Sequence, residues 1–374
     1  MFGRKKKSSD KEPTTREEEV TPSDPMHSIM PIGNEVLESS DGLAKDKERK
    51  REQLIEAVKA GDNSMILELL KLDSEFETKS DDGYTLLMEA ANNGHTNTAR
   101  LLIENGAEVN ARSNNGFTAL MYAVVGGYTD TTRLLIEKGA DVNVKSNDGS
   151  VALMGAIDCG RPDIAKLLIE KGANVKVKNM RGATALIFAA GHGYTDILKW
   201  LIEKGADVNE STEAGVTALF EASAEGYTDA AKLLIEKGAR VDARNEYGWT
   251  PLMWASQAGH EETVELLIKK GADVSARTED EVTALMVASE KDSDIVRLLI
   301  KKGAEVDAID KNGWTPLMWA CNSGNASTVK VLLEMGADAT LENNFLRTAK
   351  DIALSKERTE IVDLLDGLET KEKN

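Results

Sequence analysis

A ten-residue phrase returns along this chain at a nearly fixed interval. It reads LLIENGAEVN in its first copy and LLIEKGADVN in its second, and later copies differ by a few letters. The copies occupy residues 101–110, 134–143, 167–176, 200–209, 233–242, 266–275 and 298–307. The step is 33 residues, with one step of 32. Such a period predicts a stack of small repeated units, not a compact domain around a single core.

The repeat divides most of the chain into about ten units. We expect an array over residues 49–368, with an atypical first unit at 49–81, eight full units over 82–344 and a truncated last unit at 345–368. The full units, numbered 2 to 9 here, begin at Asp82, Asn115, Asp148, Arg181, Ala214, Tyr247, Asp280 and Asn312. The second half of unit 10 is polar, as the outer face of a C-terminal cap should be.

Within one unit the spacing predicts a turn followed by two short helices, so the fold class is all-α. In residues 82–114 the pair Asp82-Gly83 is suited to a turn. Apolar residues then recur at helical spacing on either side of Gly94, and Gly106 follows the second run. Helices of two to three turns do not persist alone, so each unit must bury its apolar faces against its neighbours.

The two ends of the chain differ from the repeats. Residues 1–48 hold four of the seven prolines and many polar residues, so we expect a disordered tail there, and residues 369–374 form a short second tail. The first 50 residues carry ten Lys and Arg against eleven Asp and Glu. Nearly all of the net charge of −18 therefore lies on the array.

This charge bears on the class of partner. An acidic surface repels phosphate backbones, which argues against nucleic acid as a ligand. A basic or apolar protein or peptide fits better. The charge also serves to keep a long surface soluble, and that explanation is at least as good.

Cysteine usage and hydropathy indicate a cytoplasmic protein, which we expect to be monomeric. Cys159 and Cys321 are five repeats apart, roughly 50 Å at the usual spacing of packed helices, so they cannot pair within one chain. Isolated thiols suit a reducing compartment. No apolar run is long enough to span a membrane, and no apolar stretch follows the basic start to make a secretory signal.

The repeated residues resemble the ankyrin repeat over about 320 residues. The segment Thr-Pro-Leu appears at 250–252 and 315–317, and elsewhere mostly as Thr-Ala-Leu. A turn glycine precedes it at Gly83, Gly116, Gly149, Gly182, Gly215, Gly248 and Gly313. The resemblance implies L-shaped units stacked into a curved array with projecting turns. It also implies a concave face, used for protein recognition, and no chemistry of its own.

The chain departs from the family pattern in two places. The family's histidine after Thr-Pro-Leu is replaced by an apolar residue, which we interpret as core packing: Met88, Met121, Met154, Ile187, Phe220, Met253, Met286 and Met318. Unit 8 has Glu281 in place of the turn glycine, and one residue and the mid-unit glycine are missing at Lys291-Asp292. We expect an altered helix–turn–helix in this unit.

No constellation of residues points to catalysis, a cofactor or a metal. The four histidines are scattered, with one in the tail and three in separate repeats. Sequence motifs for zinc proteases, dithiols and phosphate-binding loops are absent. Neither cysteine has a recurrent histidine or acidic partner for nucleophilic chemistry.

Aromatic residues mark the candidate partner-binding surface. Four of the five tryptophans occupy two positions of the unit, one after the turn glycine and one five residues later. Tryptophan is favoured at binding hot spots and disfavoured on idle surface. An apolar strip of Tyr247, Trp249, Trp254, Trp314 and Trp319 is expected, continued through unit 8 by Val282 and Val287. The full prediction is Tyr84, Phe117, Tyr122, Phe188, Tyr247, Trp249, Trp254, Gln257, Val287, Trp314, Trp319 and Asn322.

Other interpretations remain open. The indoles could instead pack on neighbouring turns and stiffen them, and Trp200, which replaces a second-helix leucine, is assigned to the core. Polar groove and turn-tip residues such as Glu221, Arg181 and Glu213 are where specificity would be encoded. The favoured function is a non-enzymatic scaffold for a protein or peptide. The alternatives are a regulatory or targeting subunit of an enzyme complex that also uses the N-terminal tail, a mechanical tether, and an enzyme with an unrecognised site.

Overall fold

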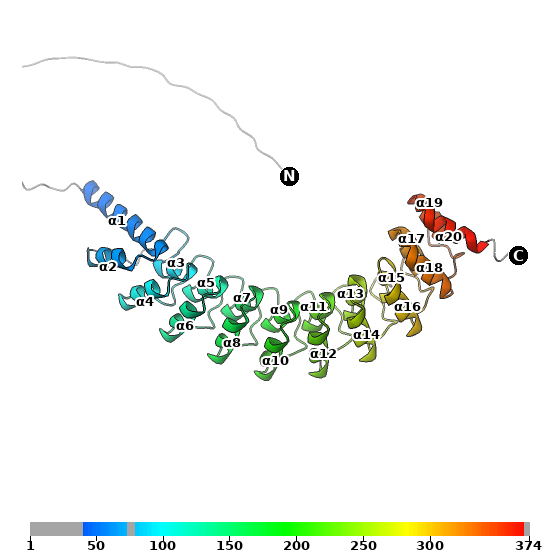
Figure 1. Cartoon of the computed structure of the whole chain (residues 1–374), viewed down its shortest axis with the longest axis horizontal. Coiled ribbons are helices and arrows are strands. Elements are labelled where there is room, and N and C mark those ends of the chain that lie inside the picture. Colours follow the sequence, from blue (N-terminus) through cyan, green and yellow to red (C-terminus); the bar gives the residue numbers. More distant parts are fainter. Residues whose placement is uncertain (1–39, 73–78, 370–374) are drawn as a thin grey trace, which may run out of the picture. The chain divides into compact units, whose positions relative to one another are not determined.

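The computed structural model describes residues 40–72 and 79–369, and these residues form twenty helices and two isolated β-bridges. The helices pair in chain order into ten units, which confirms the all-α repeat array (Figure 1). Their bounds are α1 Ser40–Ala60, α2 Asn63–Leu72, α3 Leu86–Asn92, α4 Thr96–Glu104, α5 Ala119–Gly126, α6 Thr129–Glu137, α7 Ala152–Asp158, α8 Pro162–Glu170, α9 Ala185–Gly191, α10 Thr195–Glu203, α11 Ala218–Ala224, α12 Thr228–Glu236, α13 Pro251–Ala258, α14 Glu261–Lys269, α15 Ala284–Ser289, α16 Ser293–Lys301, α17 Pro316–Ser323, α18 Ala326–Glu334, α19 Ala349–Ser355 and α20 Thr359–Glu369.

A threonine begins most of the first helices. In α3 the Thr85 hydroxyl accepts a hydrogen bond from the Met88 amide at 3.2 Å, which satisfies one of the free N–H groups at the helix start. Thr118, Thr184, Thr250, Thr283, Thr315 and Thr348 make the same bond in their units. Unit 4 is different because Val151 stands at this position and offers no side-chain acceptor.

Burial between neighbouring units holds the array together. The first helices pack in succession, α3 on α5, α5 on α7 and α7 on α9, and the second helices do the same. The apolar residues that replace the family's histidine are all buried, from Met88 to Met318, which confirms their assignment to the core. In Figure 1 the odd-numbered helices from α3 onward line the inner side of the row of units, and their even-numbered partners line the outer side.

Unit 8 has the altered geometry that its sequence predicts. Its first helix, α15, has six residues, where the other first helices of units 2 to 10 have seven or eight. Glu281 keeps the left-handed conformation of the missing turn glycine, with φ of 61°. The break between α15 and α16 needs no glycine, because Asp292 is extended there. Its carboxylate accepts hydrogen bonds from the Asp294 and Ile295 amides at the start of α16.

The boundaries at the two ends shift slightly. Helix α1 begins at Ser40, so the last residues of the segment expected to be a disordered tail, 40–48, are helical. Residues 1–39, where the rest of that tail was expected, lie outside the described part of the chain. At the other end α20 closes the array with Glu360 and Asp363 exposed. Among the residues described, none of the helices combines the length and apolar character needed to cross a membrane.

Candidate functional site

Two positions of each full unit bear on partner binding, one in the turn before the first helix and one on that helix. We call them the finger position, one residue after the turn glycine, and the helix position, one residue after the buried methionine or its equivalent. The finger positions of units 2 to 9 are Tyr84, Phe117, Ser150, Ala183, Val216, Trp249, Val282 and Trp314. The helix positions are Glu89, Tyr122, Gly155, Phe188, Glu221, Trp254, Val287 and Trp319.

Where both positions of a unit are aromatic, the two rings often pack together. The ring centroids of Trp249 and Trp254 are 5.3 Å apart in unit 7, and those of Phe117 and Tyr122 are 5.5 Å apart in unit 3. Tyr84 of unit 2 also meets Tyr122, with centroids 5.0 Å apart and nearly perpendicular rings. These predicted residues are therefore brought together into ring clusters. Trp254 still leaves 36% of its surface exposed, and the nearby Tyr247 leaves 64%.

The expected apolar strip near the C-terminal end is interrupted in unit 8. Val287, predicted to contact a partner, is only 1% exposed, so that prediction is wrong. Its short side chain sits on α15 between α13 and α17 and does not extend past these neighbours. Beyond it, in unit 9, the Trp319 indole donates to Asp310 at 3.3 Å, and Trp314 is half-buried. Gln257 and Asn322 are partly exposed on the ends of α13 and α17.

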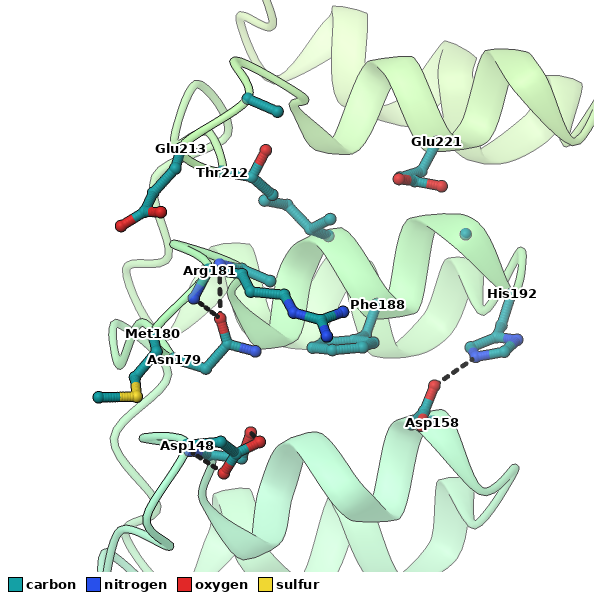
Figure 2. Close-up of a pocket in the computed structure, with 15 residues that line it drawn as sticks. Asp148, Asp158, Asn179, Met180, Arg181, Phe188, His192, Thr212, Glu213 and Glu221 are labelled. Atoms are coloured by element: carbon teal, nitrogen blue, oxygen red, sulfur yellow. Dashed lines mark hydrogen bonds and ion pairs between the residues drawn. The ribbon is translucent and has the colours of Figure 1, made fainter. Parts of the chain in front are cut away.

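A hollow of about 990 Å³ lies on the inner face of units 4 to 6 (Figure 2). Its floor includes the half-buried ring of Phe188, a predicted site residue. The finger positions Ser150 and Ala183 line it with small side chains, in contrast to the aromatic fingers of units 3 and 7. The hollow therefore lies where large finger side chains are missing from consecutive units.

Four carboxylates line this hollow together with one guanidinium and one imidazole. The carboxylates are Asp148, Asp158, Glu213 and Glu221, and the other two groups belong to Arg181 and His192. Figure 2 shows the His192 ring directed at Asp158, and the distance from Nε2 to Oδ1 is 3.4 Å. Since four carboxylates outnumber the one guanidinium and one imidazole, the hollow carries an excess of negative charge, like the chain as a whole.

Two of the carboxylates have shifted acidities. Hydrogen bonds from the Ser146 and Ser150 hydroxyls hold the pKa of Asp148 below its ordinary value, and partial burial opposes them. For Glu221 burial raises the pKa, the nearby Glu225 carboxylate raises it further, and His192 acts in the opposite direction. Among the described residues the Glu221 carboxylate has no hydrogen-bonding side chain and no ion-pair partner.

Sequence reasoning identified part of this site and missed the rest. Phe188 was predicted as a binding residue, and Glu221, Arg181 and Glu213 as polar groove or turn-tip residues. It missed Asp158, His192 and Met180. Met180 lies at the rim and is 70% exposed. The sequence feature that predicts the hollow is the pair of small residues Ser150 and Ala183 at finger positions that are aromatic in units 3 and 7. Small side chains at these positions leave a space that a ring fills elsewhere.

The remaining sequence expectations concern thiols, metals and Trp200. Both cysteines are free, Cys159 exposed and Cys321 buried, and burial raises the pKa of Cys321 to about 12. Across residues 40–72 and 79–369, His, Cys, Asp and Glu side chains form no cluster that could hold a metal ion. Trp200 packs against the core, as predicted, but is not fully buried. It is half-exposed on α10, where the Lys166 ammonium lies 4.3 Å from the ring centroid.

Comparison with known proteins identifies the class. A family model described as ankyrin repeats in three copies matches residues 54–146, 139–212, 210–278, 241–310 and 285–374. The chain therefore belongs to the ankyrin repeat family. Members of this family generally act as protein–protein interaction modules and typically carry no catalysis. A comparison with curated proteins gave no match for this chain.

Proposed function

We propose that this chain is a non-enzymatic scaffold that binds a partner protein or peptide on its concave face and turn tips. The observation that carries the proposal is the placement of large aromatic side chains on that face, where they remain partly accessible. Tyr247 and Trp254 are exposed, and Trp249, Trp314 and Trp319 are half-buried. Rigid aromatic side chains contribute large contact area at low entropic cost, which is why they dominate binding hot spots.

The family membership and the geometry support the same function. The inner face is built from first helices and turns, and its finger and helix positions vary from unit to unit. Aromatic side chains occupy that face in units 2, 3, 5, 7 and 9 and are absent from it in units 4, 6 and 8 at the finger and helix positions. The shared helix and turn residues are the same in every unit, so they cannot distinguish one partner from another. The unequally distributed aromatic positions can.

The test compares proteins captured by three forms of the full chain from a native lysate. In the groove variant Trp254→Ala and Trp319→Ala are combined. In the control Trp200→Leu changes an outer tryptophan to the residue that most other units carry at that position. We expect mass spectrometry to find proteins that the wild type and the control retain and the groove variant loses. Equal capture by all three forms would show that these tryptophans do not form the binding surface.

A further inference from the structure

Phe188 is an aromatic ring without the partner that its equivalents have. In units 3 and 7 the ring at the helix position packs against the ring at the finger position of the same unit, with centroids 5.5 Å and 5.3 Å apart. In unit 5 the finger position is Ala183, so one side of the Phe188 ring faces the hollow. The vacancy therefore resembles the space that a planar side chain fills elsewhere in this protein.

The charges around the vacancy select the kind of planar group that fits. Asp158 and Glu221 lie on the first helices flanking Phe188, α7 and α11, or at their ends, and Asp148 and Glu213 lie on the turn side. The Glu221 carboxylate is directed over α9, since a methyl group added at Gly191 would lie 3.4 Å from its Oε2. A neutral aromatic guest would leave the Glu221 carboxylate without a partner, whereas a cationic guest would pair with it.

Arg181 shows that a guanidinium is compatible with this site. Its side chain is exposed and points toward Phe188 across the hollow in Figure 2. No hydrogen bond or ion pair joins its guanidinium to another residue in the described part of the chain. Arg181 belongs to the turn tip, and no hydrogen bond or ion pair within the described residues holds its guanidinium in place. A cation from another molecule would compete with it for the same position over Phe188.

We propose that the hollow over Phe188 receives the guanidinium of an arginine side chain carried by a basic segment of the partner. The inference rests on the proposed function and names the partner chemistry for one part of the concave face. A guanidinium is planar, so it stacks on an aromatic ring in the manner of the missing finger side chain. It also presents five N–H donors in a planar fork, a geometry that suits a carboxylate such as that of Glu221.

The experiment uses the full chain and a defined probe. The probe is the blocked pentapeptide acetyl-Gly-Ala-Arg-Ala-Gly-amide, and its matched control replaces arginine with citrulline, which has nearly the same shape and no charge. Binding is followed by NMR on methyl-labelled protein, because Ala183 and Ile187 both line the hollow and carry methyl groups. We expect saturable shifts of these two methyl signals with the arginine peptide and none with the citrulline peptide at equal concentration.

Four variants locate the site. Glu221→Gln should raise the Kd roughly tenfold, as expected for losing one charged hydrogen bond. Glu89→Gln is the matched control at the same repeat position, where the carboxylate is already bonded to Asn93, and should leave the Kd unchanged. Ala183→Phe gives unit 5 the same finger ring that unit 3 carries. The ring should fill the hollow and abolish the shift of the Ile187 methyl signal. Arg181→Ala removes the competing cation and should lower the Kd.

Each outcome decides for or against the inference. Equal shifts with the citrulline peptide, shifts confined to other units, or a Kd that Glu221→Gln leaves unchanged would overturn it. If Ala183→Phe does not fold, the Glu221→Gln and Glu89→Gln pair still decides. Failure here is separable from failure of the proposed function, since the tryptophan variants test capture of a partner by different residues in units 7 and 9.

Discussion

The imidazole ring of His260 packs directly against Gly226 of the preceding repeat. A methyl group added at Gly226 would meet His260 Nδ1 at 2.5 Å, and the other ring nitrogen, Nε2, lies 2.9 Å from the Ala224 carbonyl oxygen. Tyr128 lies on Gly94 and Tyr227 on Gly193 in the same way. These ring-on-glycine contacts link successive units. They do so in a chain that has apolar residues where the family pattern has a histidine after Thr-Pro-Leu.

Gly226→Ala should therefore destabilise the array more than the same change at Gly238. Both glycines have positive φ, 73° and 93°, so either alanine pays about 1 kcal/mol of backbone strain. Gly238 has open space around it, whereas Gly226 has the ring of His260. We expect a loss of about 3 kcal/mol at Gly226 in urea unfolding followed by circular dichroism. Equal losses for the two variants would show that the ring contact carries no stability.

Ser256→Ala should stabilise the protein. The Ser256 hydroxyl is fully buried on α13 and has no hydrogen-bond partner among the described residues, so it carries an uncompensated desolvation penalty. Ser289, at the same position of unit 8, is also buried, but its hydroxyl donates to the Leu285 carbonyl at 2.6 Å. We expect a gain of about 1 kcal/mol at Ser256. The control Ser289→Ala should gain less or lose stability, and the opposite ranking would refute the explanation.

Val151→Thr should strengthen the start of α7. Thr118, at the same position of unit 3, accepts the Met121 amide at 3.4 Å, whereas the Met154 amide of unit 4 has only the Val151 carbonyl. The new hydroxyl has nearly the same size as the methyl group it replaces. We expect about 1 kcal/mol of added stability and slower hydrogen exchange of the Met154 amide. Unchanged exchange there would mean that the cap does not form.

Glu221→Gln should stabilise the free protein at neutral pH and have no such effect in acid. Burial raises the pKa of Glu221 in the folded state above its ordinary value of 4.5. The unfolded chain therefore releases this proton first as the pH rises, so the free energy of unfolding falls between 4.5 and the raised pKa. Glutamine removes that loss. Thermal unfolding of both forms across this interval should converge at low pH, and a constant difference would contradict burial as the cause.

The fold was predictable because each unit repeats the same local information. Thr85 and its equivalents begin the first helices, glycines at positive φ separate the helices, and Met88 and its equivalents fill the core. The prediction that failed concerned a single side chain. Val287 is buried because neighbouring units decide how far a short side chain can reach. Sequence spacing carries no information on such cross-unit contacts.

The sequence by itself determined the repeat, the helix pairs, the acidic surface and the aromatic positions of the concave face, because each depends on residue type and spacing within one unit. The tertiary structure decided where that face is hollow. The hollow over Phe188 arises from what Ser150 and Ala183 lack, combined with carboxylates from neighbouring units, including Asp158 and Glu221. Only stacking places these residues around a common space, since adjacent units bring side chains about 33 residues apart in the chain next to one another.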